Sequence, residues 1–314
     1  MKNLYALFIA VDKYAVPSHN LNGCVNDMTA TQQFLKRYAA AQNLEFSPKV
    51  LENDKATRDN IIKGFNHFDK AKDGDCCFFY YSGHGSQALA PTEFWTNPNG
   101  MNESIVCHDS RIAGGRDLMD KELGYLIWKA TNQKDVHFLA IMDCCHSGSA
   151  TRSTEGSRAR KVLPNFTPQS VEDYLGYKHY PQEDGQYSAP PSNHILLAAC
   201  RDNELAKETN FNGKSRGVFT FSLLETLEEG GIHQSYQELM QRTRIKAEQR
   251  AVQQHPQLEG KHGAQGFLGL AEVKGMPNVV YYDKKKSEWR VDVGSLQGLN
   301  EEADLRLKLT DGKE

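Results

Sequence analysis

The stretch VHFLAIMDCCHSG, at residues 136–148, decides the fold of this chain. Its first seven residues are mostly apolar, and the polar, glycine-containing hexapeptide 143–148 follows directly. This pattern predicts a buried parallel strand whose carboxyl end opens into a loop. Because open α/β sheets carry their functional groups at the carboxyl ends of the strands, we expect a site at this loop.

A second stretch repeats the design. The apolar run CCFFYY at residues 76–81 leads into Ser82-Gly83-His84-Gly85. His84 and Cys145 thus each follow the end of a predicted strand, 145 − 84 = 61 residues apart. This separation leaves room for a helical crossover between two parallel strands. The two residues form a candidate thiol–imidazole dyad.

The rest of the chain alternates predicted strands and helices. We expect strands at 4–11, 49–51, 76–81, 136–142, 194–199 and 265–270, and helices at 26–38, from 57 onward, at 118–130, 217–229 and 235–253. The alternation predicts an α/β fold with a parallel sheet covered on both faces. We expect residues 87–117 and 150–193 to be irregular. We expect 150–193 to be an exposed loop or linker. Period-two alternation from 278 onward predicts a small β appendage, so we divide the chain into 1–272 and 273–314.

Composition excludes several classes of protein. With 37 Lys and Arg against 40 Asp and Glu, the net charge of −3 does not suit nucleic-acid binding. No apolar stretch approaches the ~20 residues of a membrane helix, and the N-terminus reads as a strand rather than a signal peptide. The odd number of cysteines, seven, and their places within strands favour reduced thiols in a cytoplasm. We expect a cytoplasmic protein without nucleic-acid or membrane partners.

The dyad suggests nucleophilic chemistry. A thiolate attacks carbonyl carbon, and a nearby imidazole takes its proton. Cys145 would be the nucleophile and His84 the base, with the amides of Gly85 and Cys145 stabilising the oxyanion. Cys144 should face the opposite side. Spacing alone also allows a bland interpretation, in which Cys145 is a buried free thiol and His84 a solvated loop residue.

These motifs resemble those of the metacaspase and orthocaspase branch of the caspase-like cysteine peptidases. The resemblance spans roughly residues 4–270 and rests on 81–85 and 143–148, with support from 23–27, 200–204 and 217–220. It implies a caspase-like three-layer sandwich with a mostly parallel six-stranded sheet, in a bacterial member of the family. It also implies peptide-bond hydrolysis in regulated proteolysis, cell death or defence, with the cysteine before His-Ser-Gly, Cys145, as nucleophile.

The resemblance further implies an acidic pocket for the residue before the scissile bond. The matching positions are Cys24, Asp27, Ser82 and Asp143. Two carboxylates around one cavity favour a cation, so we expect cleavage after Arg or Lys. The alternative roles are a helix cap for Asp27 and a brace within its own loop for Asp143.

No cofactor is expected. Many metacaspases need calcium, but their paired-aspartate step falls here on Asp120-Lys121, and Arg152 stands in the region after the nucleophile. A lysine opposes a dication, although four acids offer a weak site: Glu103, Asp109, Asp117 and Asp120. A metal-dependent hydrolase using His84, His108 and His146 lacks the usual ligand spacing. A catalytically silent caspase-like scaffold is the other alternative.

The segment after the nucleophile suggests self-cleavage. Its basic residues are Arg152, Arg158, Arg160 and Lys161. An enzyme that cuts after basic residues holds such a tethered segment at high effective concentration, and family members often process themselves here. A solvated basic loop without a role is the alternative. We expect a monomer whose partners are protein or peptide substrates.

Overall fold

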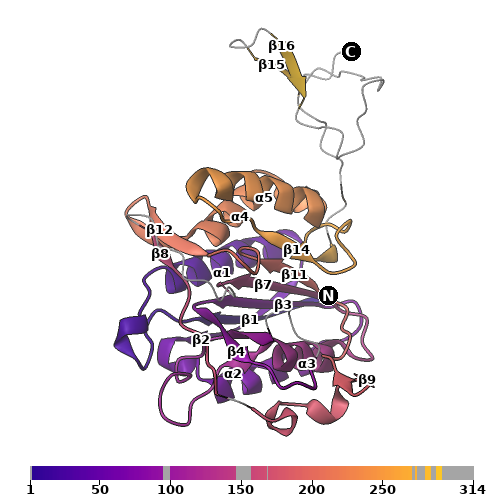
Figure 1. Cartoon of the computed structure of the whole chain (residues 1–314). Coiled ribbons are helices and arrows are strands. Elements are labelled where there is room, and N and C mark those ends of the chain that lie inside the picture. The colour runs from indigo at the N-terminus through magenta and orange to yellow at the C-terminus, as the bar shows by residue number, and fades with distance from the viewer. Residues whose placement is uncertain are drawn as a thin grey trace. The chain divides into compact units, whose positions relative to one another are not determined.

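A six-stranded sheet forms the centre of the unit 1–273, in the order β14-β11-β7-β3-β1-β2 (Figure 1). The computed structural model describes residues 2–94, 100–145, 157–167, 169–270, 273, 280–283 and 288–291. The strands of this sheet are β1 (Asn3–Ala10), β2 (Glu45–Glu52), β3 (Cys76–Ser82), β7 (His137–Asp143), β11 (Ile195–Ala198) and β14 (Gln257–Glu259). All neighbours pair in parallel except β11 and β14. The prediction of a mostly parallel six-stranded sheet is confirmed.

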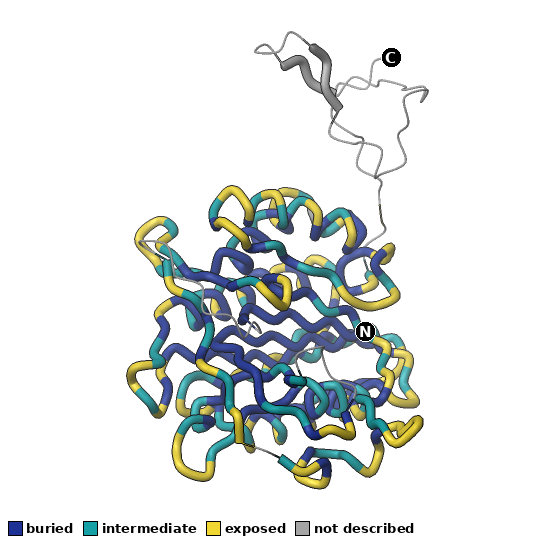
Figure 2. Tube along the Cα trace, in the orientation of Figure 1, coloured by how far each residue is buried: buried dark blue, intermediate teal, exposed yellow. Residues whose placement is uncertain are grey.

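The core follows from the continuous apolar runs of the central strands. The central strands are buried along most of their length (Figure 2). Every residue of β3 is buried, and in β7 only His137 is partly exposed. Such runs suit strands covered on both faces. Because burying one large apolar side chain contributes about 1.5–3 kcal/mol, these strands are a main source of the fold's stability.

Helices cover both faces of the sheet (Figure 1). On one side lie α1 (Cys24–Ala41), α4 (Val218–Glu228) and α5 (Tyr236–Arg250), and on the other α2 (Arg58–Gly64) and α3 (Asp120–Thr131). Local signals start two of them. The Thr57 hydroxyl accepts the amide of Asn60 ahead of α2, and Ser235 forms a capping box with Glu238 ahead of α5.

Segments predicted as irregular contain regular structure. Residues 87–117 hold most of a small antiparallel sheet made of β4 (Gly85–Leu89), β5 (Met101–Ile105) and β6 (Leu118–Met119). Residues 150–193 contain β8 (Arg158–Ala159), β9 (Gln182–Glu183) and β10 (Gln186–Tyr187). β8 pairs with β12 (Lys207–Phe211), which in turn pairs with β13 (Lys214–Gly217). For the described residues of 150–193 the expectation of an exposed loop is therefore wrong, because they supply strands and buried side chains.

The last strand of the central sheet was also predicted at the wrong place. Residues 265–270 form a 3-10 turn at Phe267–Gly269 instead, in which Leu268 adopts a left-handed φ of 55°. The apolar side chains of this stretch are buried by packing beside α1, where the Phe267 ring lies edge-on to Tyr38 at 5.2 Å between ring centroids. The short polar strand β14 takes the edge position in the sheet.

The chain divides into two compact units, 1–273 and 274–314. In the second unit β15 (Val280–Asp283) pairs antiparallel with β16 (Glu288–Val291), with Val280 opposite Val291. The predicted strand at 305–309 lies outside the described residues. No helix among the described residues is long and apolar enough to cross a membrane.

Candidate active site

The ends of β3 and β7 bring the two motifs together. The strands are direct neighbours, and Ser82 stands opposite Asp143 in their register. His84 lies two residues after the end of β3, and Cys145 lies two residues after the end of β7. Both motifs therefore leave the same edge of the sheet side by side. His146, Ser147 and Gly148 lie outside the described residues.

His84 is buried at this edge of the sheet, and hydrogen bonds to its backbone hold it in place. Its amide donates to the Tyr14 hydroxyl at 2.7 Å, and its carbonyl accepts from Tyr81. Nε2 lies 2.7 Å from the carbonyl oxygen of His19, while Nδ1 has no hydrogen-bond partner among the described residues. Burial lowers the pKa of His84 to about 3. The imidazole is therefore neutral near pH 7, the form that accepts a proton.

The Cys145 thiol is fully buried against the backbone of Ala206. Its Sγ accepts from the Ala206 amide at 2.9 Å and donates to the Ala206 carbonyl at 3.2 Å. The thiol of Cys200 contacts the Cys145 thiol, and this hydrogen bond raises the pKa of Cys200. Among the described contacts there is no hydrogen bond between Cys145 and His84. The nucleophile candidate is engaged elsewhere in this state.

Two backbone amides converge on one carbonyl oxygen beside the thiol. Gly85 and Cys145 both donate to the carbonyl of Arg160, at 3.0 and 3.2 Å. These are the two amides named from the sequence as oxyanion donors. A Cβ on Gly85 would lie 1.7 Å from the carbonyl oxygen of Cys145, so only glycine allows this approach.

The Arg160 side chain fills the predicted acidic pocket. It is fully buried, and its two terminal nitrogens go to different carboxylates. Nη2 lies 2.7 Å from Asp27 Oδ2, and Nη1 lies 3.0 Å from Asp143 Oδ2. Nη1 also donates to the Ser82 hydroxyl at 2.9 Å. Burial lowers the pKa of Arg160, but the neighbouring carboxylates raise it by a larger amount, so the guanidinium stays charged.

Both aspartates are oriented by further groups. Asp27 accepts from the Gly217 amide at 2.6 Å and from the Nε of Arg216, and Asp143 accepts from the Thr220 amide and hydroxyl at 3.1 and 2.6 Å. Burial raises the pKa of Asp27 to about 6. Cys24 is hydrogen-bonded to Ser82, and burial raises the pKa of its thiol far enough to keep it neutral. All four pocket residues named from the sequence thus surround one cation.

Sequence reasoning missed a third carboxylate in this pocket. Glu208 Oε2 lies 3.5 Å from Arg160 Nη2 and accepts the Gly23 amide at 3.1 Å. Gly217 was also missed as a wall of the pocket: a Cβ there would lie 2.5 Å from Arg160 Nη1. Glu208 stands in a polar strand, KETNF, that carries no motif, so nothing local marked it.

The other proposed cleavage residues are placed differently. Arg158 is exposed, and its Nη2 donates to the Ser18 carbonyl at 3.3 Å. Lys161 is partly exposed and follows Arg160 along the chain. Arg152 lies outside the described residues. Among the described candidates, Arg160 alone enters the acidic pocket.

One group of described residues has metal-ligand proximity. Asp12, Cys24 and Glu208 place ligand atoms within 4.8 Å of one another. Asp12 already accepts the amides of Cys24 and Val25 at the start of α1, at 2.8 and 3.0 Å. Glu208 likewise accepts the amides of Asn22 and Gly23, and burial raises the pKa of the Cys24 thiol.

The four acids considered for calcium do not all line one cavity. Asp117 pairs with Arg111 at 2.6 Å, and Asp109 accepts the Arg58 amide. Glu103 and Asp120 line a separate cavity of about 240 Å³ together with Asp202 and Glu259. Burial and the neighbouring acids raise the pKa of Glu103 to about 8, and Lys121 pairs with Asp120 at 2.5 Å. His108, one of the histidines of the metal-hydrolase alternative, binds the Lys13 carbonyl at the surface.

Comparisons with known proteins identify the family of this chain. The family model of the caspase domain, peptidase C14, matches residues 3–267. Metacaspase-1B of Aspergillus terreus is 25% identical over 292 residues, covering 82% of this chain and 75% of its own. Metacaspase-1 of Schizosaccharomyces pombe is 27% identical over 262 residues, covering 71% and 59%. The crystal structure of protein GSU0716 from Geobacter sulfurreducens superposes with a TM-score of 0.58 at 23% identity, covering 86% of this chain and all of that one. The chain belongs to the caspase-domain family of cysteine peptidases (peptidase C14) and is of the metacaspase type.

Proposed function

We propose that this protein is an endopeptidase that cleaves after Arg, and less readily after Lys, through Cys145 and His84. The observation that carries the proposal is the double engagement of Arg160. Its guanidinium lies between the carboxylates of Asp27 and Asp143, while its carbonyl accepts the amides of Gly85 and Cys145. A residue held in this way meets both requirements of the residue before a scissile bond.

Charge explains the preference for a cation. Three buried carboxylates face the pocket, from Asp27, Asp143 and Glu208, against one resident cation, Arg216. A neutral or acidic side chain would leave Arg216 alone to balance three carboxylates, which costs several kcal/mol. Since the two terminal nitrogens of an arginine reach carboxylates on different elements, a single lysine ammonium would satisfy fewer of them.

The chemistry follows from these positions. The Cys145 thiolate attacks the carbonyl carbon, and the resulting oxyanion stays on the two amides that already bind the Arg160 carbonyl. His84 takes the thiol proton and returns it to the leaving amine, so the C–N bond breaks and a thioester forms. Water then hydrolyses the thioester. No cofactor takes part in these steps, and we propose none.

We further propose that Arg160 is the site of self-cleavage and that it blocks the pocket until it is cut. The segment before it pairs with β12 as a substrate strand would, with Ala159 opposite Lys207 and the Arg160 amide donating to Ala206 at 2.9 Å. Since the pocket holds a fully buried side chain, a second arginine cannot enter at the same time. Cleavage between Arg160 and Lys161 would free the segment to leave.

A panel of peptides that differ only at the residue before the scissile bond tests the proposal. We expect Arg peptides to be hydrolysed fastest, Lys peptides more slowly and Asp peptides not at all. The same preparation of Cys145→Ala should be inactive on all of them. Equal hydrolysis of Arg and Asp peptides, or full activity of Cys145→Ala, would overturn it.

A further inference from the structure

The residues after Arg160 run alongside β4 and are joined to it by two isolated parallel bridges, at Lys161 and Asn165. The Gly85 amide donates to the Arg160 carbonyl at 3.0 Å, and the Gly85 carbonyl accepts the Val162 amide at 3.2 Å. These two bonds bracket Lys161 as in a parallel ladder. Farther along, the Asn165 amide donates to Gln87 at 2.8 Å, and the Leu89 amide donates to Asn165 at 2.9 Å. The 161–165 segment therefore runs parallel to β4 from the bond we propose is cut.

The hydroxyl of Ser86 makes two further contacts to the 161–165 segment. Its Oγ lies 3.2 Å from the Val162 carbonyl and 3.0 Å from the Leu163 carbonyl, and donates to this pair. Ser86 itself is buried. All these contacts reach backbone atoms of 161–165, so they would hold a peptide of another sequence equally well.

The opposite edge of β4 is occupied by β5, which pairs with it along its full length. Departure of 161–165 would leave the free edge of β4 with unpaired amides and carbonyls next to the catalytic thiol. Such an edge binds an extended peptide by adding it as a strand.

Side-chain burial differs sharply between successive residues of the segment. Val162 is 7% exposed and belongs to the main hydrophobic core, whereas Leu163 is 79% exposed. This is the alternation of a strand with one face against the protein. The side chain of the second residue after the proposed cleavage site therefore lies in an apolar site, whereas the side chain of the third residue is exposed.

We propose that β4 is the binding strand for the leaving side of the substrate, with an apolar site for the second residue after the scissile bond. The ligand is an extended peptide that carries valine or a similar apolar residue at that position. This inference rests on the proposed cleavage after Arg. It adds a second determinant of specificity, separate from the acidic pocket.

The test uses peptides with the chain's own sequence, SRARKVLP, cleaved by the wild-type enzyme. Replacing the valine by Asp, or methylating its backbone nitrogen, should lower kcat/KM roughly tenfold or more, the scale of one buried apolar side chain or one lost hydrogen bond. Replacing the leucine by Asp is the matched control and should change kcat/KM by less than about twofold. Equal kcat/KM for the valine and Asp peptides would overturn the inference.

A variant of the enzyme separates this inference from the proposed function. Ser86→Ala should slow the octapeptide by a larger factor than a short Arg substrate whose leaving group is a fluorogenic amine, because that substrate has no residues for β4. Equal loss on both substrates would contradict a role for Ser86 on the leaving side. Should wild type fail to cleave the fluorogenic Arg substrate, the proposed function itself falls, and this inference with it.

Discussion

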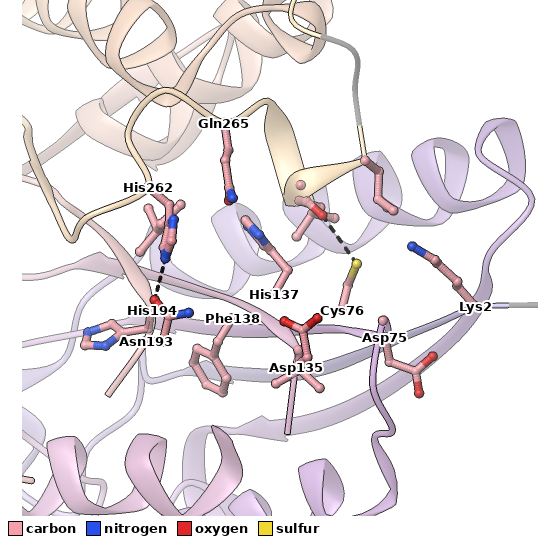
Figure 3. A pocket seen from close by; sticks show the side chains of 16 residues that line it. Lys2, Asp75, Cys76, Asp135, His137, Phe138, Asn193, His194, His262 and Gln265 are labelled. Carbon is pink, nitrogen blue, oxygen red and sulfur yellow. Dashed lines mark hydrogen bonds between the residues drawn. The ribbon is translucent and has the colours of Figure 1, made fainter. Parts of the chain in front are cut away.

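The two ends of the central sheet carry similar residue types and differ in what those residues contact. At the amino ends of the strands, a cavity of about 260 Å³ is lined by three histidines, a cysteine and a lysine: His137, His194, His262, Cys76 and Lys2 (Figure 3). At the carboxyl ends lie His84, Cys145 and the acidic pocket. Residue type alone would make the amino-end cavity equally reactive.

The contacts of these side chains distinguish the amino-end cavity from the carboxyl-end site. In the amino-end cavity the Cys76 thiol donates to the Leu268 carbonyl at 3.4 Å, and His262 bonds the Asn193 side chain (Figure 3). His137 stacks on Tyr236, and burial lowers its pKa to about 4. Burial likewise raises the pKa of Cys76 to about 12. No pair of amides converges there on a carbonyl of the chain among the described contacts, so this cysteine and these histidines read as packing.

The largest expected effect comes from replacing a cysteine or a histidine by alanine at each end of the sheet. Cys145→Ala and His84→Ala should each lower kcat/KM for an Arg peptide by several orders of magnitude, because the nucleophile and its base act as a unit. Cys76→Ala and His262→Ala, the matched changes at the amino end, should stay within about threefold of wild type. Cys144→Ser should also keep most of its activity. Loss of activity in folded Cys76→Ala or Cys144→Ser would break the comparison.

The next largest difference in kcat/KM between the two ends is expected from replacing one carboxylate at each end. Asp27→Asn should lower kcat/KM for Arg peptides on the order of 10²-fold or more, since the pocket loses a desolvated charge partner. Asp75→Asn at the amino end is the control, because the Asp75 carboxylate accepts hydrogen bonds from Asn3 and Lys72 and forms no ion pair among the described residues. Steady-state kinetics on both purified variants measure the effect. An Asp27→Asn enzyme that retains its Arg preference would contradict the assignment of the pocket.

Acidification should weaken substrate binding through Asp27. Burial raises the pKa of this carboxyl to about 6, so it becomes neutral below that pH and no longer attracts a guanidinium. His84, with a pKa lowered to about 3, stays neutral over the same range. We therefore expect kcat/KM for Arg peptides to fall as pH drops below about 6, by up to tenfold per pH unit. A profile that stays flat to about pH 5 would show that Asp27 does not titrate there.

Chelation should have the smallest effect. Of the four acids considered for calcium, Asp117 and Asp120 are paired with cations, Asp109 accepts a backbone amide, and the pKa of Glu103 is raised to about 8. Hydrolysis of an Arg peptide should stay within about twofold after EDTA or EGTA treatment, measured before and after calcium is added back. A loss restored by calcium alone would place a required cation in this enzyme.

The sequence predicted local features well and long-range ones poorly. The runs at 76–81 and 136–142 became central strands because continuous apolar sequence fits a strand covered on both faces. The apolar run at 265–270 was misread, since burial beside α1 rather than strand pairing accounts for it. Arg160 stands in a stretch that reads as solvated, and its burial depends on Asp27, Asp143 and Glu208, up to 133 residues away. No local pattern encodes such a pairing.

The central claim, that Arg160 is a built-in substrate residue, is tested most directly by intact-mass analysis of the incubated protein. Wild type should yield fragments 1–160 and 161–314, whereas Cys145→Ala should stay whole. Arg158→Gln should still be cut after Arg160. Arg160→Lys keeps a cation in the buried pocket and should be cut more slowly, and Arg160→Gln should not be cut there. Cleavage of wild type after Arg158 or Lys161 instead, or an uncut protein that is fully active on Arg peptides, would contradict the claim.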